Sequence, residues 1–393
     1  MHLFLNCLAA SAGGGLTYVR NIVPHLAERT DLRATIAIDS RLSGNFAAVE
    51  NISFLRIEAS PSAAARFWFE QTRLPDFVRR SHADVVVSTG NFALRRSPIP
   101  QILLTGNSLY CSPDFLRDLL HRGEYRMWLD TRLRGAFARR SVFWADRAVT
   151  PSRSFADQLH QWTGGDVSCI HHGFDPAIFF QDQSPLPVEI QSKLDSASGK
   201  LRLLFVSHYN YYRNFETLLK AVPYLVNELG PDKIRLFLTC MLFPHQNPGH
   251  FDPTSARNLI GELGISEQVV ELGAVPYEHL YKVYQACDLY VTPAYAETFA
   301  YPLVEAMACG LPIVASDLPV HREITSQSAQ FFPVFSHKDL AQHVLLLANS
   351  AELRNNQIEA GKRRAADFSW TTHVDKLLTL AESLLRENPQ ARH

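Results

Sequence analysis

The spacing of apolar residues restricts this chain of 393 residues to one class of fold. Short apolar runs alternate with longer amphipathic segments, which is the pattern of βα units that build a parallel sheet. The runs of the first half are LFLNCL, ATIAI, ISFLRI, DVVVS, QILLT, RAVT and VSCI, and those of the second half are LRLLFVS, IRLFLT, VVELG, LYVTP, PIVAS and QFFPV. We therefore predict an α/β protein with two Rossmann-like parallel sheets.

A segment rich in Gln, Ser and Pro, residues 180–200, separates the two series of runs. This composition is typical of a hinge followed by a short helix. We expect a first domain over 1–183, a hinge over 184–200, a second domain over 201–368 and a closing helix over 369–393. Two hinged α/β domains suggest a cleft, with ligands beyond the carboxyl ends of the strands.

Composition excludes several classes of protein. A net charge of −1 does not favour nucleic-acid binding, and the six cysteines are scattered with no C-x-x-C pair. No apolar stretch approaches the ~20 residues that span a bilayer, and the first residues lack the basic and apolar regions of a signal peptide. The expectation is a cytoplasmic protein.

Three consecutive glycines, Gly13 to Gly15, follow the first apolar run and precede an amphipathic segment. Glycines at a helix start let a phosphate approach the backbone amides. The dinucleotide fingerprint G-x-G-x-x-G fails, because its third glycine falls on Tyr18, although Asp39 stands where a ribose-binding acid would lie. A turn without any ligand is the other interpretation.

Two glutamates flank the start of a short predicted helix in the stretch YAETFAYPLVEAMACGLPIVASD. Glu297 precedes the helix, Pro302 suits its first turn, Glu305 lies about two turns beyond Glu297, and Gly310 suits the position just after its end. The amides from Phe299 to Leu303 then form an anion site, and the carboxylates can accept hydrogen bonds from vicinal hydroxyls. A charge that only stabilises the helix dipole is the alternative for Glu305.

This stretch resembles the E-x7-E signature of the retaining glycosyltransferases of family 4, which have the GT-B fold. Other stretches match the family in order, so the resemblance covers nearly the whole chain. They are ADRAVTPSRSFADQL, IHHGFDPAIF, LLFVSHYNYYRNFETLLKAVPYL, VVELGAVPYEHLYKVYQACDLYVTPA and FSWTTHVDKLL. The resemblance implies two Rossmann-like domains facing each other across a cleft, with the C-terminal helix returning to the first domain.

By position, the resemblance assigns Glu305 to the ribose hydroxyls of a nucleotide-sugar donor and Glu297 to the hydroxyls of the donor sugar. Arg213 stands where the family has a basic residue that neutralises the departing diphosphate. Asn107 completes the expected catalytic set, as a residue that orients the acceptor or the sugar. The remaining donor-binding residues implied are Gly14, Gly15, Ser207, His208, Thr298, Phe299, Ala300, Tyr301 and Leu303.

The sequence departs from the family pattern at three places. Ser207-His208 replaces the usual Gly-Arg, so neutralisation of phosphate would depend on Arg213, with His208 either assisting or serving as a structural donor. Ala300 replaces a glycine, and costs about 1 kcal/mol or more if its φ is positive. Gly106-Asn107 stands where many relatives carry His-Asp or a similar pair, so no imidazole is available as a base, and a turn residue is the alternative interpretation of Asn107.

The resemblance implies a hexosyltransferase that passes a sugar to a hydroxyl of a glycan or lipid-linked acceptor by a front-face mechanism that retains the anomeric configuration. With no D-x-D motif, neither a metal nor another cofactor is expected. One alternative is a degenerate protein that binds sugar nucleotides without transfer. A second alternative is a Rossmann oxidoreductase, which rests on the glycine loop and Asp39.

Seven arginines interleave with aromatic residues between Phe115 and Arg140, and ARFWFEQTRLPDFVRR precedes them. Such a segment can bind an anionic lipid surface at the inner membrane face or a lipid diphosphate. Ordinary solvated helix faces are the alternative interpretation.

Overall fold

The computed structural model describes residues 1–10, 13–46, 49–58, 60, 62–247 and 249–387. The chain forms two compact units. Unit 1 contains Met1–Gly173 together with the segment from Ser369 onward, and unit 2 contains Phe174–Phe368.

Unit 1 is built on a parallel sheet of seven strands in the order β3-β2-β1-β4-β5-β6-β7. The strands are β1 (His2–Asn6), β2 (Arg33–Asp39), β3 (Ile52–Ile57), β4 (Val85–Ser88), β5 (Gln101–Leu104), β6 (Arg147–Thr150) and β7 (Val167–Cys169). The helices are α1 (Gly13–Ala27), α2 (Ala63–Thr72), α3 (Leu74–Ser81), α4 (Pro113–His121), α5 (Tyr125–Trp144), α6 (Arg153–Thr163) and α16 (Trp370–Glu387), with short turns η1 (Ser40–Asn45) and η2 (Ser108–Tyr110).

Unit 2 is built on a parallel sheet of six strands in the order β10-β9-β8-β11-β12-β13. The strands are β8 (Leu201–Phe205), β9 (Ile234–Leu238), β10 (Val269–Glu271), β11 (Leu289–Thr292), β12 (Ile313–Ser316) and β13 (Ala329–Phe332). The helices are α7 (Pro176–Phe179), α8 (Val188–Asp195), α9 (Phe215–Leu229), α10 (Thr254–Glu262), α11 (Tyr277–Gln285), α12 (Tyr301–Ala308), α13 (Pro319–Thr325), α14 (His337–Asn349) and α15 (Ala351–Ala365), with the turn η3 (Tyr211–Arg213).

Every apolar run that predicted a strand forms one, so the prediction of two parallel sheets is confirmed. The central strands are buried along their whole length, as β4, β9, β11 and β12 illustrate. Such strands read as continuous apolar runs because helices cover both faces of a parallel sheet. None of the helices within the described residues is long and apolar enough to reach across a bilayer.

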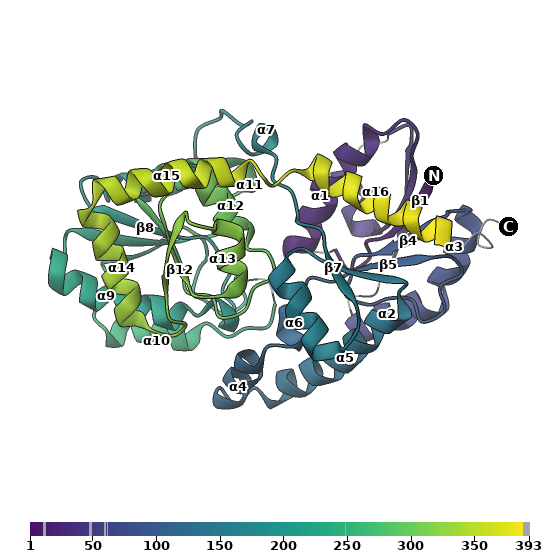
Figure 1. The fold of residues 1–393 in the computed structure, drawn as a ribbon. Helices are drawn as coiled ribbons and strands as arrows, with labels where there is room; N and C mark the ends of the chain where they lie inside the picture. Colours follow the sequence, from purple (N-terminus) through teal and green to yellow (C-terminus); the bar gives the residue numbers. More distant parts are fainter. Residues whose placement is uncertain (11–12, 47–48, 59, 61, 248, 388–393) are drawn as a thin grey trace. The chain divides into compact units, whose positions relative to one another are not determined.

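The last helix, α16, returns to unit 1 and packs beside α1 (Figure 1). Tyr18 of α1 places its hydroxyl 3.0 Å from Nε2 of His373, and Arg29 forms an ion pair with Asp375. The rings of Tyr18, His172, Trp370 and His373 lie 5.3 to 5.7 Å apart in one cluster. These contacts explain why the closing helix belongs to unit 1.

The chain passes from unit 1 to unit 2 between Gly173 and Phe174, before the hinge that the composition suggested at 184–200. Phe174, Phe179, Leu186 and Ile190 are all buried in the core of unit 2, so the stretch that contains them is part of that unit. The composition predicted a hinge because these buried apolar residues are few and are separated by polar residues.

Gly173 is the last residue before the first crossing, and we predict that Gly173→Ala destabilises unit 1. A Cβ atom there would lie 2.1 Å from the backbone N of Trp370 and 2.5 Å from its Cα. Backbone cannot yield as a flexible side chain would, so the loss of stability should reach about 3 kcal/mol. Thermal unfolding measures it.

Gly261→Ala on α10 is the matched control, because no atom lies within 4 Å of the added Cβ. Alanine in a helix interior should raise stability by roughly 0.5–1 kcal/mol. Equal unfolding temperatures for the two variants would contradict the prediction.

Candidate functional site

Three loops of unit 2 follow neighbouring strands and therefore meet at the carboxyl edge of its sheet. β11 lies between β8 and β12. From β8 the chain proceeds outward to β9 and β10 before it returns to β11, so the strand order reverses between β8 and β11. In open α/β sheets, ligands bind where this reversal occurs.

The loop between β11 and α12 is fixed from both sides. On the β8 side, Asn214 Nδ2 donates to the carbonyl of Pro293 at 3.0 Å, and the amide of Tyr295 donates to the carbonyl of Tyr212 at 3.0 Å. On the β12 side, the Ser316 hydroxyl donates to the carbonyl of Ala294. These bonds immobilise the backbone just before Glu297.

Arg213 and Glu297, both predicted as catalytic, form an ion pair. Their side chains are 21% and 10% exposed. Burial raises the pKa of Glu297, but the Arg213 guanidinium and the hydrogen bond from the Thr298 amide act together against burial and hold that pKa below its usual value. The second carboxylate oxygen accepts the Thr298 amide at 2.9 Å. Glu297 is therefore ionised and oriented at neutral pH.

Glu305 lies on the second turn of α12 and is 5% exposed. Its Oε2 accepts a hydrogen bond of 2.9 Å from the hydroxyl of Tyr284 on α11. Burial raises the pKa of Glu305 to about 7, although the Tyr284 hydrogen bond acts to lower it. The two glutamates thus differ: Glu297 is held ionised by a cation, whereas Glu305 titrates near neutrality.

The helix α12 begins and ends as the sequence indicated. Pro302 occupies its first turn, and Gly310 follows its end with a φ of 70°. The amide of Leu303 donates to the carbonyl of Ala300 at 3.0 Å, so this amide is already used within the helix start. The roles expected for the amides of Phe299, Ala300 and Tyr301 stay predictions.

Ala300 adopts the left-handed conformation, with φ of 62° and ψ of 63°. The condition stated for this position, a positive φ, is therefore met, and alanine bears the steric cost of this conformation. Ala300 is also buried, and its neighbour Phe299 packs against Tyr301 and Phe368 with ring centroids 5.1 and 5.4 Å apart. The strained residue thus follows a side chain that is packed on two sides.

Ser207 and His208 follow β8, on the same edge of the sheet. The Ser207 amide donates to Thr239 Oγ1 at 3.0 Å, and the Ser207 hydroxyl donates to the carbonyl of His208 at 2.7 Å. Partial burial and the charge of Arg213 lower the pKa of His208. The imidazole is therefore mainly neutral near pH 7 and does not replace the charge of the family's arginine.

In unit 1, the predicted glycines lie in the first turn of α1. A Cβ on Gly15 would lie 3.3 Å from the Cα of Ala10, whereas Gly14 has open space around it. Asn107 Oδ1 accepts the amide of Leu109 at 3.0 Å and caps the turn η2, as expected of a turn residue. A role for Asn107 toward a substrate stays a prediction.

Asp39, which motivated the oxidoreductase alternative, is engaged within the protein. Its carboxylate accepts hydrogen bonds from the Arg41 side chain at 2.9 and 2.5 Å and from the Arg41 amide at 3.0 Å. These hydrogen bonds hold the pKa of Asp39 below its usual value. The carboxylate caps η1 instead of being held ready for a ribose.

Sequence reasoning missed three polar residues that support the site. Tyr284 contacts Glu305, and Ser316 contacts Ala294. His321 on α13 is fully buried, with Nδ1 2.9 Å from the carbonyl of Ser316. A carbonyl only accepts, so Nδ1 carries the proton. The position of Ser316 at the end of β12 was a usable signal, but Tyr284 has the spacing of an ordinary core residue.

Unit 1 also holds a buried carboxylate that sequence reasoning missed. Glu70 on α2 is 3% exposed and lies near Arg66, with Oε1 4.0 Å from the Arg66 Nε. Burial raises its pKa to about 7, while Arg66 and a hydrogen bond from Asn6 act to lower it. Asn6 ends β1, which places Glu70 at the carboxyl edge of the sheet of unit 1.

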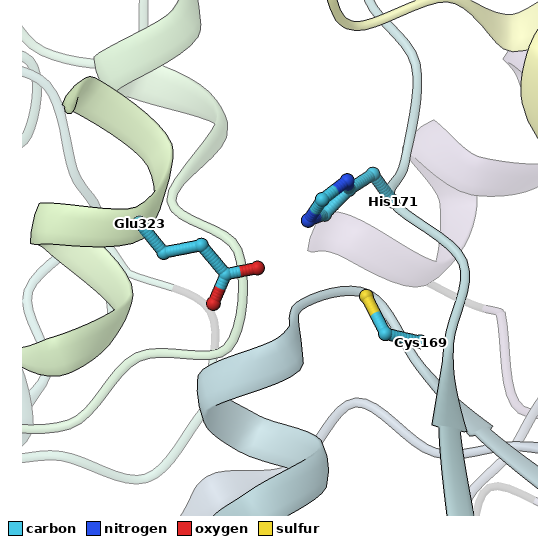
Figure 2. Close-up of side chains that lie close together, drawn as sticks. All are labelled: Cys169, His171 and Glu323. Atoms are coloured by element: carbon cyan, nitrogen blue, oxygen red, sulfur yellow. The ribbon is translucent and has the colours of Figure 1, made fainter.

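Side chains able to bind a metal are drawn in Figure 2, where Cys169 and His171 follow the end of β7 and Glu323 projects from α13. Glu323 belongs to unit 2, so unit 1 contributes two of these groups. Two protein ligands are fewer than the three or four that hold zinc. Within the described residues, neither unit by itself supplies a set of three.

Comparison with known proteins adds independent information. A family model described as Glycosyltransferase Family 4 matches residues 12–178, and one described as Glycosyl transferases group 1 matches residues 188–364. Over 256 residues the chain is 27% identical to D-inositol 3-phosphate glycosyltransferase of Mycobacteroides abscessus, which covers 63% of this chain and 54% of that protein. The chain thus spans about half the length of this curated relative.

Two solved structures resemble almost the whole chain. Sucrose-phosphate synthase from Thermosynechococcus elongatus has a TM-score of 0.75 at 16% identity, with 98% of this chain and 100% of that chain covered. Anabaena HepE in complex with UDP-glucose has a TM-score of 0.70 at 16% identity, with the same coverage. Because the sequence identity is only 16%, this similarity establishes the fold alone.

Ala300→Gly should stabilise the protein by about 1 kcal/mol, because glycine adopts a positive φ without the steric cost that alanine bears. Ala306→Gly in the same helix is the control and should lower stability, since its Cβ is buried and its backbone is helical. Chemical denaturation of both variants measures the change. A loss of stability in Ala300→Gly would contradict the strain inferred at this position.

Proposed function

Because the chain belongs to glycosyltransferase family 4 and has the GT-B fold, we propose that it transfers a hexose from a nucleotide-sugar to a hydroxyl of a glycan or lipid-linked acceptor, with retention of configuration. The observation that carries this proposal is the juxtaposition of the buried Arg213–Glu297 pair with the start of α12 at the switch point of unit 2. The complex of HepE with UDP-glucose supports a donor of this class.

The donor would bind across the loops after β8 and β11. The ionised Glu297 accepts hydrogen bonds from hydroxyls of the sugar, and Glu305 accepts them from the ribose. Between them, Arg213 and the amides at the start of α12 contact the diphosphate. The ion pair with Glu297 holds the guanidinium of Arg213 at this edge of the sheet.

In the transfer step, the bond between the anomeric carbon and the phosphate oxygen breaks, and its electron pair leaves with the nucleoside diphosphate. The acceptor oxygen bonds to the same face of the anomeric carbon, and its proton passes to an oxygen of the departing phosphate. Arg213 stabilises the charge that develops on the diphosphate, and the carboxylate of Glu297 stabilises the positive charge on the sugar. In this scheme, protein groups stabilise the negative charge of the leaving diphosphate, so no metal is required.

A protein that binds sugar nucleotides without transfer is the second candidate function. The lowered pKa of His208 favours it, because a neutral imidazole leaves the diphosphate with one cation fewer than the family's arginine would supply. Release of free nucleotide from any donor would exclude it.

Unit 1 has a surface suited to contact with an anionic membrane. On α5, Tyr125, Leu129, Leu133 and Phe137 recur every fourth residue and are 40% to 67% exposed. The residues that α5 buries are smaller, among them Thr131, Gly135, Ala138 and Val142. The apolar stripe therefore faces away from the core, as on a helix that lies at a lipid interface.

Charge and aromatic neighbours complete this membrane-facing surface. Arg126, Arg132, Arg139 and Arg140 of α5 are exposed. Trp68 of α2 is 64% exposed and adjoins α5 through Phe67, whose ring lies 5.2 Å from that of Phe137. Arginines beside apolar side chains match the anionic headgroups and acyl chains of a lipid surface, which suits a lipid-linked acceptor.

Glu305→Gln should weaken binding of the cognate nucleotide by roughly ten-fold or more, because hydrogen bonds to a charged acceptor are lost. Glu297→Gln should leave nucleotide affinity nearly unchanged and lower kcat by roughly a hundred-fold, because the sugar loses its ionised partner. Calorimetric titration with UDP, GDP, dTDP and ADP, then with the corresponding sugars, measures affinity, and product analysis measures turnover.

The same assays test the remaining parts of the proposal. A chelator should leave the rate unchanged, and the product should have the anomeric configuration of the donor. The acceptors should include lipid-linked sugars and a phosphorylated polyol, since the M. abscessus relative is named for inositol 3-phosphate. Unchanged nucleotide affinity in Glu305→Gln would overturn the assignment of the site.

Leu129→Asp combined with Leu133→Asp should lower binding to vesicles rich in phosphatidylglycerol by roughly ten-fold, because apolar area is lost from the interface. Val188→Asp is the matched control, since Val188 is 84% exposed but lies in unit 2. Vesicle sedimentation measures both variants. If the wild type bound neutral vesicles as tightly as phosphatidylglycerol vesicles, or if high salt did not weaken its binding, an electrostatic contribution would be contradicted.

A further inference from the structure

Glu305 owes its orientation to a residue from another element of the fold. Tyr284 lies on α11, is fully buried, and donates its hydroxyl to Glu305 Oε2 at 2.9 Å. The same hydroxyl is 3.3 Å from the carbonyl of Pro302, in the first turn of α12. One hydroxyl therefore reaches both the carboxylate and the backbone at the start of the helix that carries it.

The ring of Tyr284 is itself fixed by packing. Its centroid lies 5.8 Å from that of Tyr290 on β11 and 6.4 Å from that of Phe179 on α7. A ring enclosed in this way keeps its hydroxyl in one position. The hydrogen bond therefore fixes the position of the Glu305 carboxylate. A carboxylate has two oxygens and about four acceptor positions, so Oε1 stays available when Oε2 accepts from Tyr284.

We propose that Tyr284 is a positioning residue for the donor site: its hydroxyl holds Glu305 with one carboxylate oxygen directed to the ribose of the nucleotide and favours the ionised carboxylate. The proposal rests on the function assigned to Glu305 above. It adds a residue outside the motif to the machinery of nucleotide binding.

The hydrogen bond from Tyr284 matters because the other groups that surround Glu305 are neutral. The groups that interact electrostatically with Glu305 are Tyr277 and Tyr284 of α11, Tyr290 of β11 and Cys309 at the end of α12. Burial raises the pKa of each of these groups, so all four are neutral near pH 7.

The charged residues near this part of unit 2 contact other groups. Asp175 interacts with Tyr277, and Lys362 of α15 lies beside Gly310, where an added Cβ would be 2.8 Å from the Lys362 Cε. Arg213 pairs with Glu297. The Tyr284 hydroxyl is thus the contact that lowers the pKa of Glu305 against the effect of burial.

This arrangement couples nucleotide binding to pH. Ribose hydroxyls donate hydrogen bonds to the ionised carboxylate, whereas a protonated Glu305 has lost one acceptor. Since the pKa of Glu305 is about 7, nucleotide affinity should rise as the pH increases through that value. Without the Tyr284 hydroxyl the carboxyl group holds its proton more tightly, so the rise should move to higher pH.

The test is Tyr284→Phe, which removes one hydroxyl and keeps the ring. Nucleotide Kd is measured by calorimetry from about pH 5.5 to about pH 8.5, with the wild type in parallel. We expect affinity near pH 7 to fall roughly ten-fold, as for a lost hydrogen bond to a charged group, and the pH at half-maximal affinity to increase. A purely structural role for Tyr284 would lower the unfolding temperature without moving that pH.

Tyr281→Phe is the matched control on the same helix. Its hydroxyl donates to the carbonyl of Asp182 at 2.7 Å, away from Glu305. This variant loses a comparable hydrogen bond but should keep the pH dependence of the wild type. If Tyr281→Phe moved the pH profile as much as Tyr284→Phe did, the proposal would be overturned.

Glu305→Gln separates failure of this inference from failure of the proposed function. If nucleotide affinity is unchanged in Glu305→Gln, the assignment of Glu305 is wrong. If Glu305→Gln weakens binding and abolishes the pH dependence but Tyr284→Phe behaves as the wild type, the assignment stands and the positioning role is rejected. Weakening in both variants, with a shifted profile in Tyr284→Phe alone, supports the proposal.

Discussion

The ion pair between Arg213 and Glu297 depends on strands that become neighbours only where the order of the sheet reverses. The two residues are 84 positions apart, and each comes from the loop after its own strand. Each charge offsets part of the cost of burying the other. The hydrogen bonds of Asn214 and Ser316 to the intervening loop keep the pair in register, so the site is as rigid as the sheet beneath it.

The fold and the places of the two glutamates around the start of α12 could be predicted because they are encoded locally. A buried parallel strand needs a continuous apolar run, and β11 and β12 show one on each side of the helix that carries Glu305. Pro302 and Gly310 mark that helix through their own backbone preferences. At Ala300 the sequence stated only what a positive φ would cost, and the structure supplies that φ.

The supporting residues could not be predicted because they are encoded by tertiary contact. Tyr284 lies 21 positions before Glu305, at a spacing that also suits an ordinary core tyrosine. Hydrogen-bond partners also determine the role of Asp39. Its place at the end of β2 suited a ribose, but its carboxylate accepts hydrogen bonds from Arg41, two positions further on. The position of a polar residue after a strand indicates where a site lies, whereas its neighbours determine what the residue does.

The two crossings of the chain have a consequence for how the protein forms. The amide of Phe174 donates to the carbonyl of Phe368 at 3.2 Å, so the ends of unit 2 adjoin each other. Unit 2 is thus one continuous segment inserted into unit 1, whose last helix is synthesised after that segment. On the ribosome, unit 2 can complete its core first, while the face of α1 that receives α16 stays uncovered until α16 itself has been synthesised. A chaperone that binds the nascent chain would therefore bind the uncovered face of α1 in unit 1.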